Sequence, residues 1–284
     1  MVDNSRQLSQ QRSHSKVHLW QSHPWLKNSN LQATILFFLL LAALLLVWEL
    51  GVQLKVFSPV MPSASRTIAD FWTWIIDPFY DNGPNDKGIG LHLLASLQRV
   101  ALGFFIGSAI AIPLGIAIGL SEVVSKAVDP FIQLLRPVSP LAWLPLGLAI
   151  LKSSEATALF VIAITSISPT LINTKFGVSN VSRDYLNVAQ TLGASRWRTI
   201  AKVILPAAAP QIVAGLRISI GISWLVIVAA EMIVGGTGIG SFVWNEWNNL
   251  NVTSIITAIV VIGLVGVLLD RLLGLLHSWV SFGK

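Results

Sequence analysis

The arginine at position 136 is the residue whose setting most directly suggests a functional role. It precedes three closely spaced prolines, Pro137, Pro140 and Pro145, in the segment RPVSPLAWLPLGLAIL. Prolines break a straight helix, and broken backbone at membrane depth is tolerated where it is buried in protein or lines a water-filled cavity. An arginine at such a place is by default a functional residue, so we interpret Arg136 as part of a transport pathway. The alternative is that its side chain reaches the lipid headgroups or pairs with Asp129.

A basic segment, residues 180–210, is the second feature with distinctive chemistry. It lies between two long apolar stretches and contains a single acid among four basic residues. We predict that it is a cytoplasmic docking element between two membrane-spanning helices. The alternative is an amphipathic basic loop that lies on anionic lipid. The charged residues are Arg183, Asp184, Arg196, Arg198 and Lys202.

This basic segment is predicted to fold as two short helices joined at Gly193. Apolar residues recur at helical spacing on both sides of the glycine, which is well placed to follow a helix end because a left-handed backbone suits glycine. Ser195 can cap the second helix with its side chain, and Pro206 and Pro210 mark the start of the next span. The two apolar stripes are Tyr185, Val188, Ala189 and Leu192, then Trp197, Ile200, Ala201 and Ile204.

The composition identifies a membrane protein. Of the 284 residues, 54% are hydrophobic and 11% charged, and the mean hydropathy is +0.70, whereas soluble domains average about 25% charged residues. The net charge of +6 comes from residues that flank apolar segments without a dense patch, which argues against nucleic-acid binding. The chain has no cysteine and therefore no disulfide or thiolate metal site, and no metal site is expected.

Six apolar segments are predicted to cross the membrane, since about 20 apolar residues span the hydrocarbon core. Basic residues precede the first segment, and six spans return the chain to the same side, so both termini and the basic segment are expected in the cytoplasm of a plasma-membrane protein. The predicted organisation is a polar tail (1–30), a first transmembrane helix (31–52), an external segment with an amphipathic helix (53–98) and a core (99–284) with its cytoplasmic loop at 176–206. The core spans are 100–121, 130–151, 156–174, 205–232 and 252–269, and residues 121–130 are expected to form a loop.

Small residues and turn residues organise the remaining segments. Glycines at four-residue intervals, Gly103, Gly107, Gly115 and Gly119, predict close helix packing in lipid. The amphipathic helix is predicted at 65–77, with Ile68, Phe71 or Trp72, and Ile75 or Ile76 along its apolar face. The link GGTGIGSFVWNEWNNLN is expected to form an external gate or to dip back into the membrane, because it lacks the lysine of a phosphate-binding loop.

The run AQTLGASRWRTIAKVILPAAAP resembles the signature loop of binding-protein-dependent ABC importer permeases. That pattern reads Glu-Ala-Ala, three residues, Gly, nine residues, Ile, any residue, Leu-Pro. Gly193 stands for its glycine, Val203 for its isoleucine and Leu205-Pro206 for its last two residues, whereas Asn187 and Val188 replace the leading Glu and Ala. The resemblance implies that this loop is the coupling helix, which sits in a groove of an ATPase subunit. The coupling residues carried over are Ala189, Leu192, Gly193, Ala194, Ser195, Arg196, Leu205 and Pro206.

Further segments narrow the resemblance to the nitrate, sulfonate and bicarbonate group, and most closely to cyanobacterial nitrate permeases. They include PSASRTIADFW, SWLVIVAAEMIVGGTGIG and DPFYDNGPNDKG. The implied fold is an all-α integral membrane protein with six transmembrane helices, a type I ABC importer core and a cytoplasmic coupling helix. The implied function is import of nitrate, and of nitrite, with bicarbonate or sulfonate as the alternative substrate.

The resemblance also implies partners and a path for an oxyanion. The partners are a second copy of the chain in a homodimer, two cytoplasmic ATPase subunits, which in that group are described as different, an external substrate-binding protein and membrane lipid. ATP and Mg²⁺ belong to the ATPases, and no cofactor or catalytic residue is expected in this chain. Cations and neutral donors for the anion are predicted at Arg136, Ser139, Trp143, Arg217, Ser223 and Trp224.

Two other classes of function remain as alternatives. A channel or secondary transporter would use Arg136 and Glu231, and a membrane-embedded enzyme would use His92, Glu231 or Asp270. Neither the charge relay that the first requires nor the convergent ligands that the second requires stand out in the sequence.

Overall fold

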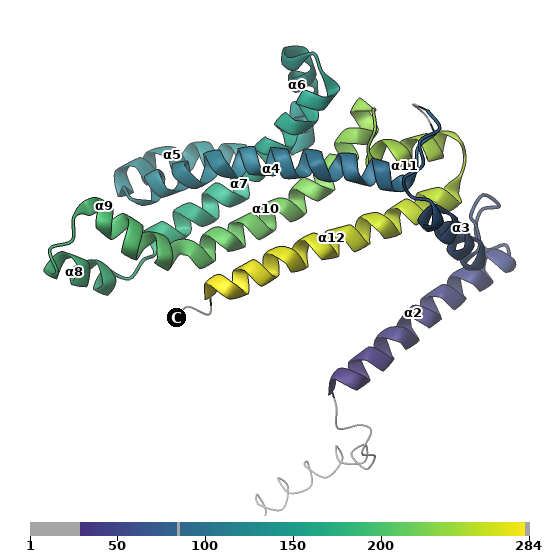
Figure 1. Ribbon diagram of the computed structural model, residues 1–284, viewed down its shortest axis with the longest axis horizontal. Coiled ribbons are helices and arrows are strands. Elements are labelled where there is room, and N and C mark those ends of the chain that lie inside the picture. The colour runs from purple at the N-terminus through teal and green to yellow at the C-terminus, as the bar shows by residue number, and fades with distance from the viewer. Residues whose placement is uncertain (1–28, 84–85, 282–284) are drawn as a thin grey trace, which may run out of the picture. The chain divides into compact units, whose positions relative to one another are not determined.

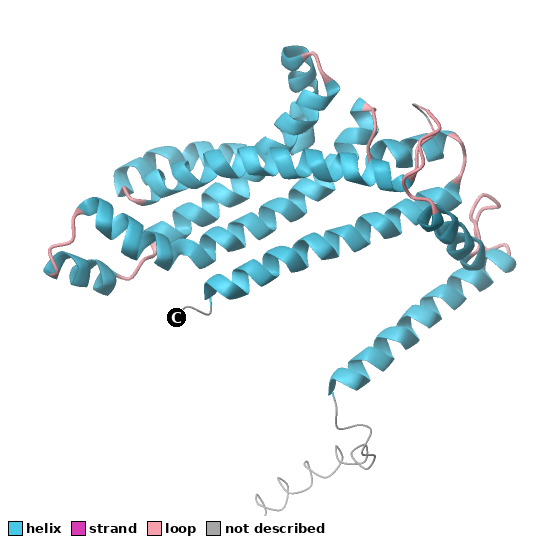
Figure 2. Ribbon diagram, viewed as in Figure 1, coloured by secondary structure: helices cyan, strands magenta, loops and turns pink. Residues whose placement is uncertain are grey.

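The computed structural model describes residues 29–83 and 86–281, and all of the regular elements in these residues are helices (Figures 1 and 2). The predicted tail, residues 1–30, lies almost wholly outside the described residues. The chain divides into two compact units, Met1–Arg66 and Thr67–Lys284. The prediction of an all-α membrane protein is confirmed, because the described elements are helices and several are long and apolar enough to span a membrane.

The first unit contains α2 (Ser29–Gln53), an apolar helix of the length needed to cross a bilayer. The predicted helix at 31–52 is thus present. Its last turns are tied to the chain that follows, because the Trp48 indole N–H donates to the Pro62 carbonyl over 3.1 Å and the Ser65 N–H donates to the Glu49 carboxylate over 3.1 Å. The short helix α3 (Ala64–Ile76) begins here and ends in the second unit.

Long helices form the body of the second unit and run side by side in Figure 1. They are α4 (Ile89–Gly119), α7 (Ser154–Ser179), α10 (Leu205–Val234) and α12 (Val252–Ser281). Together with α2 they make five helices, among the described residues, that are long and apolar enough to span a membrane, or six if a bent pair of helices counts as one span. The six predicted spans correspond to these segments.

The glycines of α4 pack this helix directly against α7. A Cβ on Gly103 would overlap Ile162, one on Gly107 would overlap the Ala163 carbonyl, and one on Gly115 would overlap Thr174. Only a residue without a side chain fits this approach, as the four-residue glycine spacing predicts. The α4–α7 pair is consequently the tightest helix contact in the bundle.

The third predicted span is broken, and its first half differs from the prediction. Residues 121–130, expected as a loop, belong to α5 (Glu122–Leu135). The Ser121 hydroxyl caps this helix by accepting from the Val124 N–H, and Glu122 pairs with Lys126 one turn later. The capping hydrogen bond and the ion pair stabilise a helix here, although the polar residues of this segment suggested a loop.

A sharp bend follows α5, where the prolines predicted it. A single 3₁₀ turn, η3 (Pro140–Trp143), leads into the short helix α6 (Leu144–Leu151), and the two halves of the span meet at 87°. This bend exposes the inner side of α7 and creates the cavity described below.

The boundary predicted between residues 98 and 99 falls inside α4. The helix starts at Ile89, so the end of the predicted external segment and the second span form one continuous helix of 31 residues. No proline lies between Ile89 and Val100, and Pro113 is accommodated within the helix.

The apolar face predicted for α3 is only partly the buried one. Ile68, Trp72 and Ile76 are exposed within this chain, whereas Trp74 packs edge-on against Phe242, with ring centroids 5.0 Å apart. The indole N–H of Trp74 donates to Ser254 Oγ over 3.1 Å. The side of α3 that packs on the bundle is therefore the side that carries Trp74, and not the side that the spacing of apolar residues indicates. Trp74 lies there because its indole N–H has a hydrogen-bond partner on that side.

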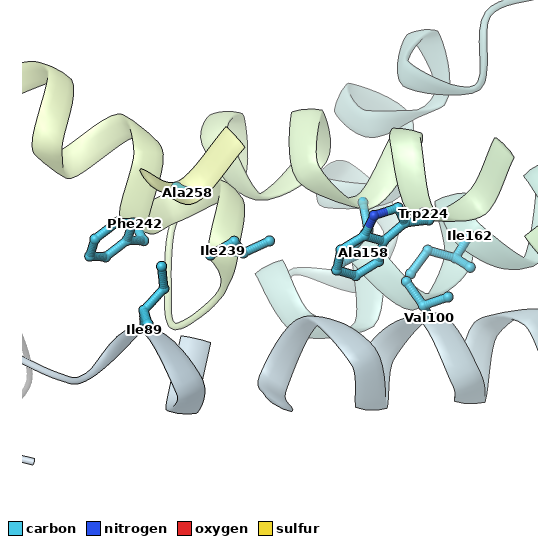
Figure 3. Packing of buried hydrophobic residues seen from close by; sticks show 9 residues of the cluster. Ile89, Val100, Ala158, Ile162, Trp224, Ile239, Phe242 and Ala258 are labelled. Atoms are coloured by element: carbon cyan, nitrogen blue, oxygen red, sulfur yellow. The ribbon is translucent and has the colours of Figure 1, made fainter. Parts of the chain in front are cut away.

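The core lies where α4, α7, α10, α11 (Ile239–Asn248) and α12 converge (Figure 3). Trp224 is its largest member and is 3% exposed. Its indole N–H donates to the Ile262 carbonyl over 3.0 Å, which removes the cost of burying the polar edge of the ring. The other fully buried members are Ile89, Val100, Ala158, Ile162, Ile227, Ile239, Phe242 and Ala258.

Candidate functional site

A cavity of about 610 Å³ opens at the broken span. Its walls come from the α5–η3 break, from the middle of α7 and from two isoleucines of α10, Ile218 and Ile222. Arg136 and Trp143, predicted from the sequence as pathway residues, both line it. The cavity is largely apolar apart from these two side chains and a few polar groups of α7. Such a surface can hold a small anion only weakly, through one cation and a few neutral donors.

Arg136 is exposed at the C-terminal end of α5 and forms no ion pair within the described part of the chain. The expected alternative partner, Asp129, is instead paired with Lys175 of α7. The reason is geometric: Asp129 lies two turns before Arg136, about 10 Å along the helix axis, and within reach of Lys175 of α7. The charge of Arg136 is thus available to the cavity.

Arg217, the other predicted cation, is compensated. Its guanidinium makes two bonds of 2.7 Å to the Asp270 carboxylate of α12. The pair lines a second cavity of about 530 Å³, and this cavity shares Ile218 and Ile222 with the first. Arg217 therefore lies beside the cavity of Arg136, with its charge neutralised by a carboxylate.

Three neutral residues predicted for the pathway do not line the cavity. Ser223 is fully buried against Ser166, with 3.0 Å between the hydroxyl oxygens, and Trp224 lies in the core. Ser139 is exposed at the start of η3, between two residues that line the cavity. The sequence does not distinguish a residue that faces a cavity from one that faces a neighbouring helix, so it could not show that Ser223 and Trp224 are buried between helices in this structure.

The neighbouring hydroxyl side chains of α7, Thr165, Ser166 and Ser168, have two roles. Thr165 and Ser166 donate to the carbonyls four residues earlier, Val161 and Ile162, which is the usual arrangement for hydroxyls in membrane helices. Thr165 and Ser168 nonetheless line the 610 Å³ cavity. Polar groups that sequence reasoning missed there include Asn173, which donates to the Pro169 carbonyl over 2.8 Å.

The basic segment forms the predicted helix–turn–helix at one end of the bundle (Figure 1). α8 (Arg183–Thr191) ends before Gly193, which has φ +67°, and α9 (Arg196–Thr199) follows. The turn is closed by the Ala194 N–H, which donates to the Ala189 carbonyl over 3.0 Å. No atom lies near the position that a Cβ on Gly193 would take, so the glycine is required by its left-handed backbone and not by lack of space.

The turn presents two large apolar side chains outward. Leu192 and Trp197 are 80% and 81% exposed, whereas Ala189 and Ile204 face inward at 5% and 8%. The two apolar stripes predicted from spacing are therefore split between an inner face and a projecting tip. An exposed apolar tip with basic edges is suited to a protein partner.

Two details of the segment differ from the prediction. Ser195 occupies the N-cap position of α9, but its hydroxyl accepts no capping bond. The Leu205-Pro206 pair, which the sequence suggests as the end of the second helix, is not an end: a π turn, η4 (Ile200–Ile204), joins α9 to α10 without a break. The wider turn fits the missing N–H of Pro206, so the Leu205-Pro206 pair marks a change of helix type and not a helix end.

A buried polar network at the opposite end of the bundle was not predicted as a site. It joins Arg99 and Ser96 of α4 to Glu231 of α10. The sequence feature that could have indicated this network is a pair of opposite charges, Arg99 and Glu231, near the ends of two predicted spans. No group of three histidine or acidic residues able to hold a metal ion occurs in residues 29–83 and 86–281.

Comparisons with known proteins agree with this geometry. Residues 111–282 match the family described as "Binding-protein-dependent transport system inner membrane component". The chain is 45% identical over 240 residues to the nitrate import permease protein NrtB of Synechocystis sp., covering 84% of this chain and 86% of that protein. It is also 45% identical over 207 residues to the bicarbonate transport system permease protein CmpB of Synechococcus elongatus, covering 72% and 74% of the two chains.

Solved structures show the same fold. The MetNI methionine ABC transporter in its inward facing conformations aligns with a TM-score of 0.60 at 16% identity, covering 66% of this chain and 94% of that one. A family match over more than half the chain, with relatives at this identity, leaves no other assignment: the chain belongs to the binding-protein-dependent transport system inner membrane components, the multi-pass permease proteins of ABC transporters.

Proposed function

We propose that this protein is the membrane-spanning subunit of an ATP-driven importer that moves nitrate, and nitrite, across the plasma membrane. The observation that carries the proposal is the similarity to nitrate import permeases over most of the chain, which reaches 48% identity over 213 residues with NrtB of Leptolyngbya laminosa. The cavity at Arg136 supports it, because a single cation in a largely apolar wall suits a small monovalent anion.

ATP hydrolysis is assigned to separate cytoplasmic ATPase subunits, which bind ATP and Mg²⁺. The exposed tip at Leu192 and Trp197 and the basic residues around Gly193 support docking of one ATPase subunit at this turn. Two copies of the chain would form a homodimer with two ATPase subunits. Closure of the ATPases would move both turns together and rock the two bundles, which turns the cavity outward.

Both termini and the coupling turn are placed in the cytoplasm, and α11 and the glycine-rich link on the external side. The excess of basic residues in the 180–210 segment supports this orientation. An external substrate-binding protein would then deliver the anion at the α11 end. Selection of the anion by that protein explains why the cavity needs to hold its cargo only weakly.

Uptake of labelled nitrate in a strain that lacks the chain tests the proposal. Restored nitrate uptake on re-expression, dependent on ATP and on the co-expressed ATPases, is the expected result. Labelled bicarbonate measured in the same cells distinguishes the alternative, which the CmpB relatives support. Restored bicarbonate uptake without nitrate uptake would show that bicarbonate is the substrate and not nitrate. Uptake that persists without any ATPase would show that the chain works as a channel or secondary transporter.

A further inference from the structure

The carboxylate of Glu231 is the centre of a buried network that connects three segments of the chain. The side chain is 1% exposed and accepts hydrogen bonds from Ser96 Oγ over 2.8 Å, from Arg99 Nη1 over 2.9 Å and from the Gly240 N–H over 3.0 Å. Ser96 and Arg99 belong to α4, Glu231 belongs to α10, and Gly240 belongs to the first turn of α11. Each of the two carboxylate oxygens therefore has at least one donor, Arg99 for Oε1 and Gly240 for Oε2, as a buried carboxylate requires.

The same α4 side chains also hold the backbone of the glycine-rich link. Ser96 Oγ accepts from the Ile239 N–H over 2.8 Å, and His92 Nδ1 accepts from the Gly238 N–H over 3.1 Å. Arg99 donates to the Thr237 carbonyl. Ile239 is also a fully buried member of the core. Residues 237–240 are therefore held both by apolar packing and by polar groups of α4 and α10. Gly238 has no room for a side chain, since a Cβ there would overlap the Glu231 carboxylate.

Two glycines immediately before this segment have the properties of a hinge. Gly235 and Gly236 have φ +73° and +95°, and no atom lies within 4 Å of the position that a Cβ on either would take. Adjacent glycines in open space can absorb a large change of backbone angles. A cavity of about 720 Å³ adjoins them and is lined on one side by Thr237, Ser241 and Trp244 of the link and α11. The segment therefore has both a pivot and space beside it.

We propose that Arg99 and Glu231 form a latch that positions residues 237–242 against α4, and that this segment swings about Gly235 and Gly236 when the latch opens during transport. Arg99 and Glu231 act through the link and not on the transported anion. α11, whose first turn bonds to Ser96 and Glu231, lies at the end of the bundle opposite α8 and α9 (Figure 1), so with the proposed orientation the latch controls the external opening. The inference rests on that orientation and is independent of which anion is carried.

Cysteine labelling tests the latch, because the chain contains no cysteine of its own. Ser241 lies on α11 within the proposed mobile segment and is 3% exposed, so Ser241→Cys reports movement of that segment. Cells that express the full transporter are treated with a membrane-impermeant maleimide, and the labelling rate is compared between Ser241→Cys alone and the same chain with Glu231→Gln or Arg99→Gln. We expect both latch variants to raise the rate by about tenfold or more, since removing one partner of a buried ion pair strongly favours local opening.

Glu246→Gln is the matched control, because Glu246 lies on α11 outside the network and its replacement is expected to leave the rate unchanged. Co-purification of the ATPases shows that each variant assembles. The labelling rate of the parent Ser241→Cys chain should also rise during ATP turnover. With Glu231→Gln added, the rate should be high both with and without ATP. A purely structural role of Glu231 would not produce this loss of ATP dependence.

Equal labelling of the parent and both latch variants, with normal assembly, would overturn the latch. Labelling that occurs only with a membrane-permeant maleimide would overturn the external placement, and the latch inference with it. Neither result bears on whether nitrate is the cargo, which the uptake assay decides separately.

Discussion

Arg217 of α10 and Asp270 of α12 face each other in a two-point ion pair, with both N–O distances at 2.7 Å. The pair connects two helices that are largely apolar. Its side chains keep 42% and 53% of their surface exposed within this chain. Within a membrane, such a pair is stable only if neither charge is left alone.

Replacing Asp270 by Asn should therefore lower the stability of the protein in detergent and its yield from membranes. Arg217 would lose both of its bonds and would remain as an uncompensated charge between the helices. The midpoint of thermal unfolding measures the effect. Arg271→Gln, one residue away and without an ion pair among the described residues, is the control, and exchange of the two residues (Arg217→Asp with Asp270→Arg) should restore part of the loss. Equal midpoints for Asp270→Asn and the control would contradict a structural role for the pair.

Arg136→Ala should reduce anion flux by about ten- to hundredfold, the usual effect of losing one hydrogen bond to a charged group. The expected reason is that Arg136 supplies the unpaired charge of the 610 Å³ cavity. Flux per assembled transporter is measured in proteoliposomes, and Arg136→Lys should retain more of it because the charge remains. Arg217→Ala should also lower flux, through loss of the pair beside the cavity. Unchanged flux in both alanine variants, with normal assembly, would remove these residues from the pathway.

Gly193→Val should uncouple ATP hydrolysis from transport. At φ +67° a β-branched residue is disfavoured, and even an ordinary residue there costs about 1–2 kcal/mol, so the turn that carries Leu192 and Trp197 would change shape. The ratio of anion transported to ATP hydrolysed is the measurement. Gly193→Asn is the matched variant, because asparagine tolerates the left-handed region, and it should keep most of the coupling. A normal ratio in Gly193→Val would argue against docking at this turn.

Gly107→Ala should destabilise the bundle by about 1–3 kcal/mol, the usual cost of overpacking. The added methyl group would meet the Ala163 carbonyl of α7, which is backbone and cannot rotate away. Gly263→Ala on α12 adds the same group where no atom lies within 4 Å, and it should be neutral or slightly stabilising because alanine favours a helix. The two thermal midpoints, measured in the same detergent, decide whether the α4–α7 contact depends on glycine.

The pH dependence of stability should contain a contribution from Glu246 of α11. Partial burial raises the pKa of this carboxyl above its ordinary value of 4.5, and its bonds to Asn251 and Asn249 only partly offset the effect. The folded protein therefore binds the proton more tightly than the unfolded chain does. The resulting stabilisation is complete below about pH 4.5 and is lost as the pH rises through the folded-state pKa. Glu246→Gln should flatten this part of the profile of unfolding midpoint against pH, and a profile that is unchanged would contradict the assignment.

The sequence predicted the spans, the proline break and the glycine turn because each depends on local chemistry. Apolar length fixes a span, Pro137, Pro140 and Pro145 prevent a straight helix, and Gly193 permits a left-handed backbone. Long-range partners were not predictable in the same way. Helical spacing could not show that Trp224 points into the core and Arg136 into a cavity, or that Asp129 pairs with Lys175.

The continuity of α9, η4 and α10 has a mechanical consequence. The helical run from Arg196 to Val234 contains 39 residues, which at 1.5 Å per residue is roughly 58 Å, about twice the thickness of the hydrocarbon layer. One end carries Trp197, and the other carries Glu231. In the orientation proposed above, one continuous helix extends from the side of the membrane where the coupling turn lies to the opposite side, so a rotation imposed at its base is expected to reach the opposite surface. Its helical hydrogen bonding is interrupted at the π turn Ile200–Ile204 and at Pro210.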